Sequence, residues 1–543
     1  MSLADVLDLE KAYRRVQQDK RDDTWPDIVN YRDYQRVLEQ NLEILRNQIA
    51  DPDAYQAKNL LDIDIPKKGF TLRPGAVPLI DDRIAYQAIA DYLSPHFQPE
   101  PCVFSNILSP DVKSSRMFLP GVQLWLNFQQ QIEELCQQYP YVVETDITAY
   151  FEHISHDRLI HRIQDLFEES VDNDVLQQAK NFLLRKLFWR WSKGTRFGIP
   201  QVNDASSFFA NVFLDELDKW MIRQGYPYLR YVDDMRIFAT DEPSARQALA
   251  EIIVKLREMG LHVASGKTKV RRTDEVLQEM RNSSVQMNAI EEELSSRIPE
   301  RLENAATMLE EFIESLIENP DNFNDRQFRY CVNRFKRLKV NGLAMGAHET
   351  VANEVLNRLY TMPYSTDVFV DYLSLFPESE DVQVRTIEFL EGPYNIYPWQ
   401  ELQLIELLIR LDIFFDYQDR ALSIARTIAR DTHKHPACRE KAFIFWGKSG
   451  DYADRREIRG IYFDEPDEGI KRSILYAIQE MQIGERNNFF QGVVNDSDAI
   501  RMTAEYVRDL NAPTYHFYNP PAGFDISEDW DSNDLDDLPM PSA

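Results

Sequence analysis

The chain has 543 residues, with 61 Lys and Arg against 90 Asp and Glu, and a formal net charge of −29. A hydrophobic fraction of 43% excludes a wholly disordered chain, and the absence of any apolar run of about 18 residues excludes a membrane-spanning helix. The N-terminus does not resemble a signal peptide, and the four scattered cysteines form no disulfide or zinc framework. We therefore expect a cytoplasmic protein without a membrane partner.

The acidity is concentrated in the C-terminal half. Residues 1–282 hold 35 basic and 43 acidic side chains, whereas residues 283–543 hold 26 and 47. Because phosphate binding needs Lys and Arg, the total charge disfavours nucleic acid as a partner. The near balance in the first half still allows a local basic channel there.

The first half alternates between helical and strand-like patterns. Residues 1–60 are predicted to be helical, and residues 61–80 read as a basic strand-and-turn segment. Helices are predicted over 82–92 and 122–137. Residues 141–282 mix short apolar strands with helices, so the fold class of this half is α+β.

From about residue 283 the pattern is almost purely helical. Helices of ordinary length are joined by short polar or proline-containing links, which favours stacked helix pairs of a HEAT-like solenoid, although no clean sequence repeat occurs. The last part is strongly acidic and is predicted to be disordered. We therefore predict three units: 1–282, 283–515 and the tail 516–543.

An aspartate ends the first apolar strand of the mixed region. The run Tyr141-Val142-Val143-Glu144-Thr145 leads into Asp146, and a helix is predicted to begin near Ser155. Taken alone, such an aspartate is most often a turn or helix-capping residue.

A pair of adjacent aspartates marks a predicted hairpin. Two β-prone runs flank Asp233 and Asp234, which places both carboxylates at the tip. Adjacent carboxylates repel each other, and a divalent cation would relieve that repulsion. Mg²⁺ prefers a few carboxylates together with phosphate oxygens, and two such ions can clamp an in-line phosphoryl transfer. The alternative is an exposed Asp-Asp turn.

Between these two segments, a turn opens a long helix. The turn begins at Gly198 and contains Pro200 and Gln201, and the helix buries apolar residues such as Phe209. A plain loop leading into a helix would explain the same pattern.

Together, the three segments resemble motifs A, B and C of reverse transcriptases, in the order of that family. The residues that carry the resemblance are Asp146, Tyr150 and Phe151 for motif A; Pro200, Gln201, Ser206, Ala210 and Asn211 for motif B; and Tyr231, Val232, Asp233 and Asp234 for motif C. Residues 82–89 look like the family's fingers helix, and residues 248–261 followed by Lys267 look like motif D.

The resemblance implies a right-hand polymerase with fingers and palm in residues 1–282, which makes DNA from deoxynucleotides. It implies that Asp146, Asp233 and Asp234 are catalytic and, with the Ile147 carbonyl, bind two Mg²⁺ ions, for which Mn²⁺ can substitute. A steric gate at Phe151 would favour deoxynucleotides over ribonucleotides. The nucleotide-binding residues implied are Lys67, Arg73, Arg83, Phe151, Gln201 and Lys267.

One basic stretch interleaves cations with aromatic rings, as backbone tracking and base stacking on nucleic acid require. Its residues are Arg185, Lys186, Trp189, Arg190, Trp191, Lys193 and Arg196. We expect this stretch to hold the DNA product or an RNA template. A solvated helix face is the alternative.

Departures from the family pattern point to a subclass. The usual glycine after Pro-Gln is Val202, and the segment continues with Asp204 and Ser206. This altered motif, joined to a helical C-terminal half, looks like the prokaryotic abortive-infection and defence-associated reverse transcriptases. That resemblance implies antiphage defence, protein-primed and template-independent synthesis, a homo-oligomer, and a phage or host protein as trigger.

Three other readings of the sequence stay open. The chain is alternatively a conventional RNA-templated reverse transcriptase. It is alternatively a non-catalytic scaffold whose helical half binds a phage or host protein. The third reading is an RNA polymerase or terminal nucleotidyltransferase of the same palm architecture.

Overall fold

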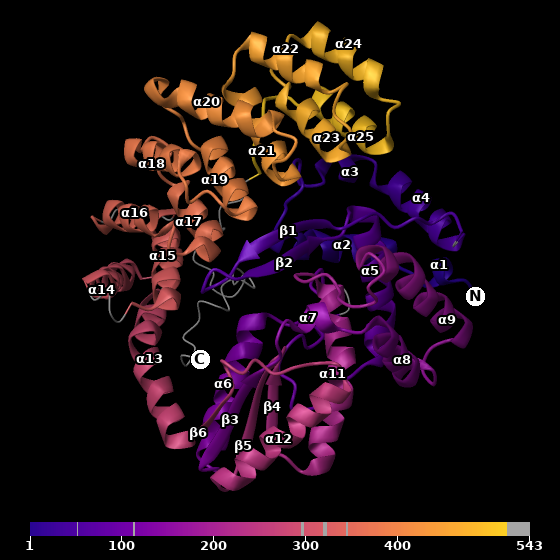
Figure 1. Ribbon diagram of the computed structural model, residues 1–543, viewed down its shortest axis with the longest axis vertical. Coiled ribbons are helices and arrows are strands. Elements are labelled where there is room, and N and C mark those ends of the chain that lie inside the picture. The colour runs from indigo at the N-terminus through magenta and orange to yellow at the C-terminus, as the bar shows by residue number, and fades with distance from the viewer. Residues whose placement is uncertain are drawn as a thin grey trace.

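The computed structural model describes residues 1–517 except 52, 112–113, 295–297, 319–322, 341 and 344–345. An α+β half is followed by a half whose described elements are all helices (Figure 1). Both fold classes were predicted from the sequence. All but the first two residues of the predicted tail 516–543 lie outside the described residues.

The N-terminal region has the predicted order of helices, hairpin and helices. The hairpin pairs β1 (Leu61–Pro66) with antiparallel β2 (Leu72–Val77). The helices before it are α1 (Leu3–Val6), α2 (Leu9–Asp19), α3 (Arg32–Arg36) and α4 (Leu38–Ala50). The helices after it are α5 (Ile80–Leu93), which is buried along most of its length, and α6 (Gly121–Cys136).

A four-stranded antiparallel sheet forms the centre of this half, with strand order β4-β5-β3-β6. Its strands are β3 (Tyr141–Asp146), β4 (Tyr228–Tyr231), β5 (Asp234–Ala239) and β6 (Lys269–Arg272). Because side chains alternate along a strand, Val142 and Phe238 pack towards α6, whereas Val143 and Ile237 join the core formed with α11 and α12.

Further helices belong to this half. They are α7 (Tyr150–His153), α8 (His156–Phe167), α9 (Asn173–Asn181), α11 (Asp204–Gln224) and α12 (Glu242–Glu258). The helix α8 begins next to Ser155, as the sequence predicted, and the Ser155 side chain caps it by accepting a hydrogen bond from the Arg158 amide. The Asn203 side chain caps α11 in the same way, through the Ser206 amide.

The helical half begins with α13 (Thr273–Leu294), which follows β6 directly. The predicted domain boundary at residues 282–283 therefore falls inside one helix. In the figure, α13 leads away from the sheet towards the remaining helices (Figure 1).

Most of the helices after α13 lie in two rows. In one row, α15, α17, α19, α21, α23 and α25 pack each against the next, and in the other α16, α18 and α20 do the same. Their bounds are α14 (Pro299–Glu318), α15 (Asp325–Val340), α16 (Ala347–Arg358), α17 (Thr366–Leu373), α18 (Glu380–Glu391), α19 (Pro398–Arg410), α20 (Phe415–Arg430), α21 (Pro436–Ser449), α22 (Tyr452–Ile461), α23 (Glu468–Ala477), α24 (Ile483–Val493) and α25 (Asp498–Arg508).

The chain returns on itself, because the last helices pack against the N-terminal region. Figure 1 shows α3 beneath α25, and the two helices are in contact. The Arg472 guanidinium bonds to Asp27 at 2.6 Å and to Asp33 at 2.9 Å. Trp25 shares one hydrophobic core with the helical half and donates its indole N–H to Glu440 at 2.8 Å. The two halves are therefore joined by a buried interface as well as by α13.

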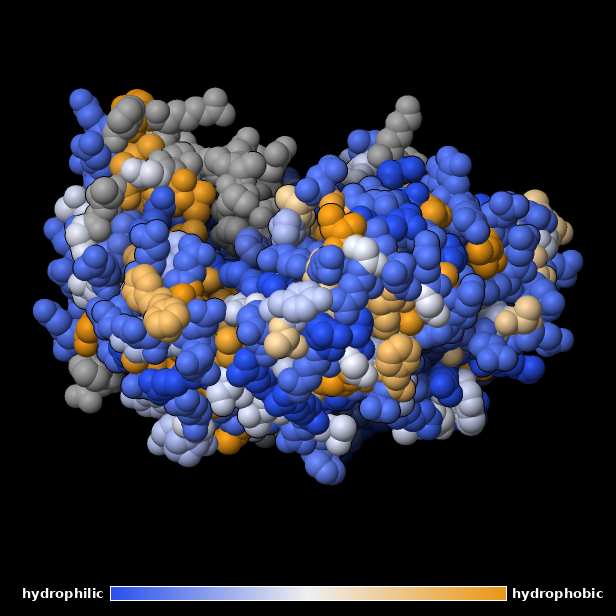
Figure 2. Space-filling model, turned by 90° about the horizontal axis from the view of Figure 1, so that it is seen from above, coloured by the Kyte–Doolittle hydropathy of each residue, from blue (hydrophilic) through white to orange (hydrophobic). Residues whose placement is uncertain are grey.

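The surface at this end of the molecule is largely hydrophilic, with scattered hydrophobic residues (Figure 2). Among the described residues, no helix is both long and apolar enough to cross a membrane.

Candidate active site

The three predicted catalytic aspartates lie near one another at one end of the central strands β3 and β5. Asp146, the last residue of β3, is the register partner of Asp234, the first residue of β5. Asp233 lies in the two-residue turn between β4 and β5, as the hairpin prediction required. Like charges directly opposite each other in a sheet are destabilising, so this arrangement calls for a compensating positive charge.

Two side-chain cations supply that compensation. The Lys267 ammonium bonds to Asp146, and the Arg236 guanidinium bonds to Asp234. Arg236 also lies 3.7 Å from Glu144, its register partner on β3. The cation of Lys267 is largely exposed, at 61%, whereas Arg236 is 12% exposed and fixed in the sheet. Lys267 is therefore the cation that can more readily move away.

Burial perturbs the acids at this end of the sheet. Loss of water, followed by the negative charge of Asp146, raises the pKa of Asp233 to about 7. Burial also raises the pKa of Asp234, although the Arg236 charge opposes the change. At Asp233 the Lys267 charge opposes the rise in pKa but is outweighed by burial and the neighbouring carboxylates, and such a perturbed group in a motif of this kind is typical of a functional site.

The donor set fits a divalent cation in its chemistry. Carboxylates are the ligands that Mg²⁺ prefers, and the crowding at Asp146 and Asp233 is the kind that a cation relieves. Ile147 faces Val263 in a short antiparallel bridge. Its two hydrogen bonds run from the Ala264 amide to the Asp146 carbonyl and from the Thr148 amide to the His262 carbonyl, so neither of them uses the Ile147 carbonyl. In the described part of the chain, no group of three or more His, Cys, Asp or Glu side chains converges to hold a metal.

The loops of all three motifs contain a non-glycine residue with positive φ. These residues are Ala149 (φ 47°), Val202 (φ 62°) and Val232 (φ 54°). The two valines are β-branched, so the left-handed conformation is costly for them. Val202 occupies the position where the family usually has glycine, and its positive φ gives a physical reason for that preference.

Motifs A and B are held together by hydrogen bonds. The Tyr150 hydroxyl donates to the Ala210 carbonyl at 2.6 Å, and the Ile199 amide donates to the Phe151 carbonyl at 3.1 Å. Phe151 is partly buried, with its ring centroid 5.4 Å from that of Tyr150. Gln201 is also partly exposed in the turn that precedes α11. These two predicted nucleotide-binding residues therefore belong to neighbouring segments.

The three basic residues predicted to bind the nucleotide from the fingers differ in how exposed their side chains are. Lys67 is exposed at the end of β1, and Arg73 on β2 is partly exposed. The predicted nucleotide-binding role of Arg83 does not fit the structure. Arg83 is 1% exposed and bonds to Asp19 at 2.7 Å and to Asp23 at 2.8 Å. Its guanidinium is committed to these carboxylates and does not reach the surface.

The predicted nucleic-acid stretch forms a π-helical segment, η3 (Phe182–Phe188), followed by α10 (Trp189–Trp191). Trp189 is 57% exposed and suits base stacking, whereas Trp191 is 5% exposed and packs on Tyr86 at 5.2 Å between ring centroids. The expected stacking role of Trp191 is therefore wrong for this arrangement.

The cations of this stretch fall into two groups. Lys193 pairs with Asp62 at 2.9 Å, and Arg196 pairs with Asp157 at 2.7 Å. The remaining cations lie at the surface, with Lys186 partly covered; they are Arg185, Lys186 and Arg190.

Sequence reasoning missed two arginines that flank the turn. Arg236 follows Asp234 by two residues, so strand alternation alone could have placed both side chains on one face. Arg230 lies inside the short strand β4, where a charged residue between apolar neighbours is a signal of a buried partner.

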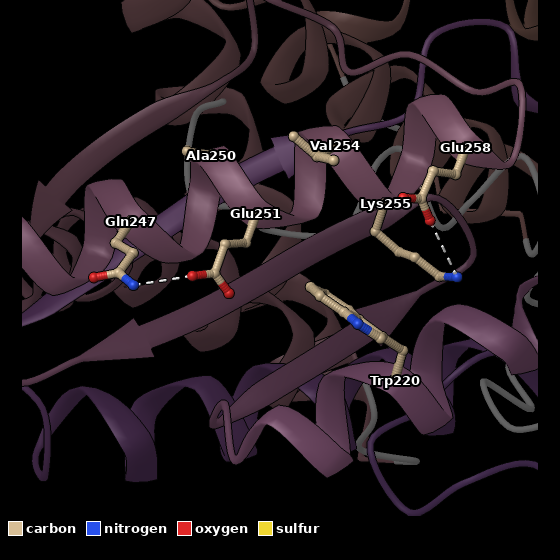
Figure 3. A pocket seen from close by; sticks show the side chains of 7 residues that line it. All are labelled: Trp220, Gln247, Ala250, Glu251, Val254, Lys255 and Glu258. Carbon is tan, nitrogen blue, oxygen red and sulfur yellow. Dashed lines mark hydrogen bonds and ion pairs between the residues drawn. The ribbon is translucent and has the colours of Figure 1, made fainter.

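A surface pocket of about 320 Å³ lies between α11 and α12, and its lining includes residues of the motif D segment but none of motifs A, B and C (Figure 3). Trp220 comes from α11, and the other lining residues come from α12. Glu251 accepts a hydrogen bond from Gln247 at 2.9 Å, and Lys255 lies 3.7 Å from Glu258. These polar side chains are thus paired with one another.

Comparison with known proteins agrees with the motifs. Residues 65–293 match the family model described as reverse transcriptase (RNA-dependent DNA polymerase), so the chain contains a reverse transcriptase domain. A domain of this family implies nucleotide-polymerising activity in general. No curated protein matches the chain.

Solved structures with similarity include telomerases. Telomerase from Candida albicans in complex with a TWJ fragment of telomeric RNA is 11% identical, with 69% of this chain and 67% of that chain covered and a TM-score of 0.29. Apo telomerase from Candida tropicalis is also 11% identical, with 83% and 69% covered and a TM-score of 0.29. The reverse transcriptase assignment rests on the family match and the motifs.

Proposed function

We propose that this chain is a DNA polymerase of the reverse transcriptase family that joins deoxynucleotides by metal-assisted phosphoryl transfer. The observation that carries the proposal is the register pairing of Asp146 with Asp234, with Asp233 in the adjoining turn. Three carboxylates at one end of the sheet within a reverse transcriptase domain suit the binding of a triphosphate through divalent cations.

Asp146 and Asp233, with Asp234 and the Ile147 carbonyl, would hold two Mg²⁺ ions. Bound there, the ions would supply charge stabilisation for the triphosphate and a lower pKa for the attacking hydroxyl. Lys267 is paired with Asp146 in this structure, and the exposure of its ammonium supports a role in contacting a phosphate. Lys67, Arg73 and Gln201 are further candidates for holding the nucleotide.

Phe151 would act as the gate against ribonucleotides. Its ring is partly exposed in motif A, beside the turn of motif B that contains Gln201. We expect Phe151→Ala to raise ribonucleotide incorporation relative to deoxynucleotide incorporation by roughly tenfold or more, because a missing ring leaves room for the 2′-hydroxyl. The ratio of kcat/KM for the two nucleotides measures this. An unchanged ratio would remove Phe151 from this role.

We place the biological role in antiphage defence, in the cytoplasm, with synthesis primed by a protein hydroxyl and without a conventional template. The altered motif B at Val202 and Asp204 supports this subclass. So does the two-row helical half, a HEAT-like solenoid in this proposal, which follows β6 directly. With 25 Tyr residues, the chain offers many hydroxyls as primers. Homo-oligomer formation and a phage or host protein as trigger belong to the same proposal.

The test is incorporation of labelled deoxynucleotides by the purified protein with Mg²⁺, compared with Asp233→Asn. Product that forms without added primer or template, migrates with the protein and is released by protease would support protein priming. The exposed Arg185, Trp189 and Arg190 favour a second candidate, RNA-templated synthesis. That candidate predicts product only with an added RNA template and primer. Loss of defence in Asp233→Asn cells would exclude a pure scaffold.

A further inference from the structure

A buried ion pair lies directly behind the turn that contains Asp233. Arg230 on β4 is 1% exposed, and so is Asp218 on α11. Arg230 donates Nε–H and Nη2–H to the two carboxylate oxygens of Asp218, at 2.9 and 2.6 Å. A bidentate pair of this kind fixes the plane of the guanidinium. The position of its third nitrogen is thereby fixed as well.

That third nitrogen reaches the turn itself. Nη1 of Arg230 donates to the Val232 carbonyl at 2.8 Å and to Oδ1 of Asn211 at 3.1 Å. The side-chain N–H of Asn211 donates to the Ser105 backbone carbonyl at 3.0 Å. The Ser105 hydroxyl in turn accepts the backbone N–H of Val232 at 2.7 Å. Both backbone polar groups of Val232 are therefore held by one closed network of side chains.

The conformation of Val232 explains why such a network is needed. Its φ is 54°, in the left-handed region that a β-branched residue disfavours. A strained residue persists only where its surroundings determine its conformation. Val232 is one of the two residues that join β4 to β5, and the other is Asp233, whose carbonyl accepts the Ile147 amide at 3.3 Å. The conformation of Val232 thus sets the direction of Asp233.

We propose that Arg230, together with Ser105 and Asn211, is a positioning network that locks Val232 in the left-handed conformation and so places the Asp233 carboxylate beside Asp146. This inference rests on the proposed polymerase function. In this proposal Arg230 positions Asp233 through the turn and does not contact the substrate. Asp218 fixes the Arg230 guanidinium, and the network in turn holds the backbone N–H and carbonyl of Val232.

The test compares Ser105→Ala and Arg230→Lys, each alone and each combined with Val232→Gly. Ser170→Ala, at a serine that bonds to the Phe167 carbonyl, is the matched control. We expect kcat for deoxynucleotide incorporation to fall roughly tenfold or more with little change in KM, because small misplacements of a reacting constellation are costly. Glycine adopts positive φ readily, so Val232→Gly should restore a large part of the loss.

The inference is overturned if Ser105→Ala and Arg230→Lys keep the wild-type kcat, or if Val232→Gly restores nothing. A lower unfolding midpoint in Arg230→Lys would mark a folding defect. Ser105→Ala then decides, because it leaves the pair of Arg230 with Asp218 intact.

Amide hydrogen exchange at Val232 gives a readout that does not depend on activity. Faster exchange in Ser105→Ala at an unchanged unfolding midpoint supports the lock, and unchanged exchange refutes it. If the wild-type protein incorporates no nucleotide under any condition, the proposed function fails, and the exchange comparison still decides whether the network holds the turn.

Discussion

A buried carboxyl group lies where the N-terminal region meets the helical half. Glu440 on α21 is 6% exposed and accepts the Trp25 indole N–H at 2.8 Å. A Cβ atom added at Gly469 would lie 2.3 Å from Oε1 of Glu440, so the site has no spare room. Burial is the largest cause that raises the pKa of Glu440 from 4.5 to about 7; Asp467 adds to it, and Trp25 opposes it.

The raised pKa makes this group destabilising at high pH. An acid whose pKa is higher in the folded state than in the unfolded state binds more protons when folded, so the free energy of unfolding falls as pH rises between the two values. At about 1.4 kcal/mol per pKa unit, the rise from 4.5 to about 7 costs about 3 kcal/mol at pH 8. At pH 5 the cost is about 1 kcal/mol.

Glu440→Gln removes the charge and keeps an oxygen to accept the Trp25 N–H. We therefore expect the variant to be more stable than wild type by about 3 kcal/mol at pH 8 and by no more than about 1 kcal/mol at pH 5. Urea unfolding followed by tryptophan fluorescence at the two pH values measures the difference. Glu39→Gln, at an exposed position of α4, is the control.

A Glu440→Gln variant that is less stable than wild type at pH 8 would contradict this prediction. A difference in stability that does not widen between pH 5 and pH 8 would contradict it as well. Other acids with raised pKa values are present in both proteins and cancel in the comparison.

Two further predictions concern the active site. Lys267→Met should lower the Mg²⁺ concentration for half-maximal activity several-fold, because the ammonium competes with the ion for Asp146; an unchanged or higher requirement for Mg²⁺ in a titration would contradict this. Asp234→Asn should reduce kcat by roughly tenfold, because Asp234 is already paired with Arg236, whereas Asp233→Asn should reduce it by roughly a thousandfold or more. Equal losses in steady-state incorporation would show that the two aspartates share one role.

Much of the candidate site follows from local sequence. The apolar run before Asp146 and the two runs around Asp233 and Asp234 predict a strand and a hairpin, and the structure has both. The helix α11 begins after Asn203, close to where the motif B turn predicted it. Strand alternation, turns and helix caps depend on residues a few positions apart, so one sequence is enough to predict them.

The tertiary structure determines which charged side chains are buried and which opposite charges they pair with. Arg83 reads as a phosphate-binding residue in the sequence, yet its partners are Asp19 and Asp23, about 60 residues earlier. Lys267 reaches Asp146 across 121 positions, and Arg472 reaches Asp27 across 445. The spacing of the motifs was enough to predict which acids lie together at the end of the sheet. Which cations face them, and which are taken up elsewhere, depends on segments that only folding brings together, because the energy of a charge is set by its burial and its neighbours.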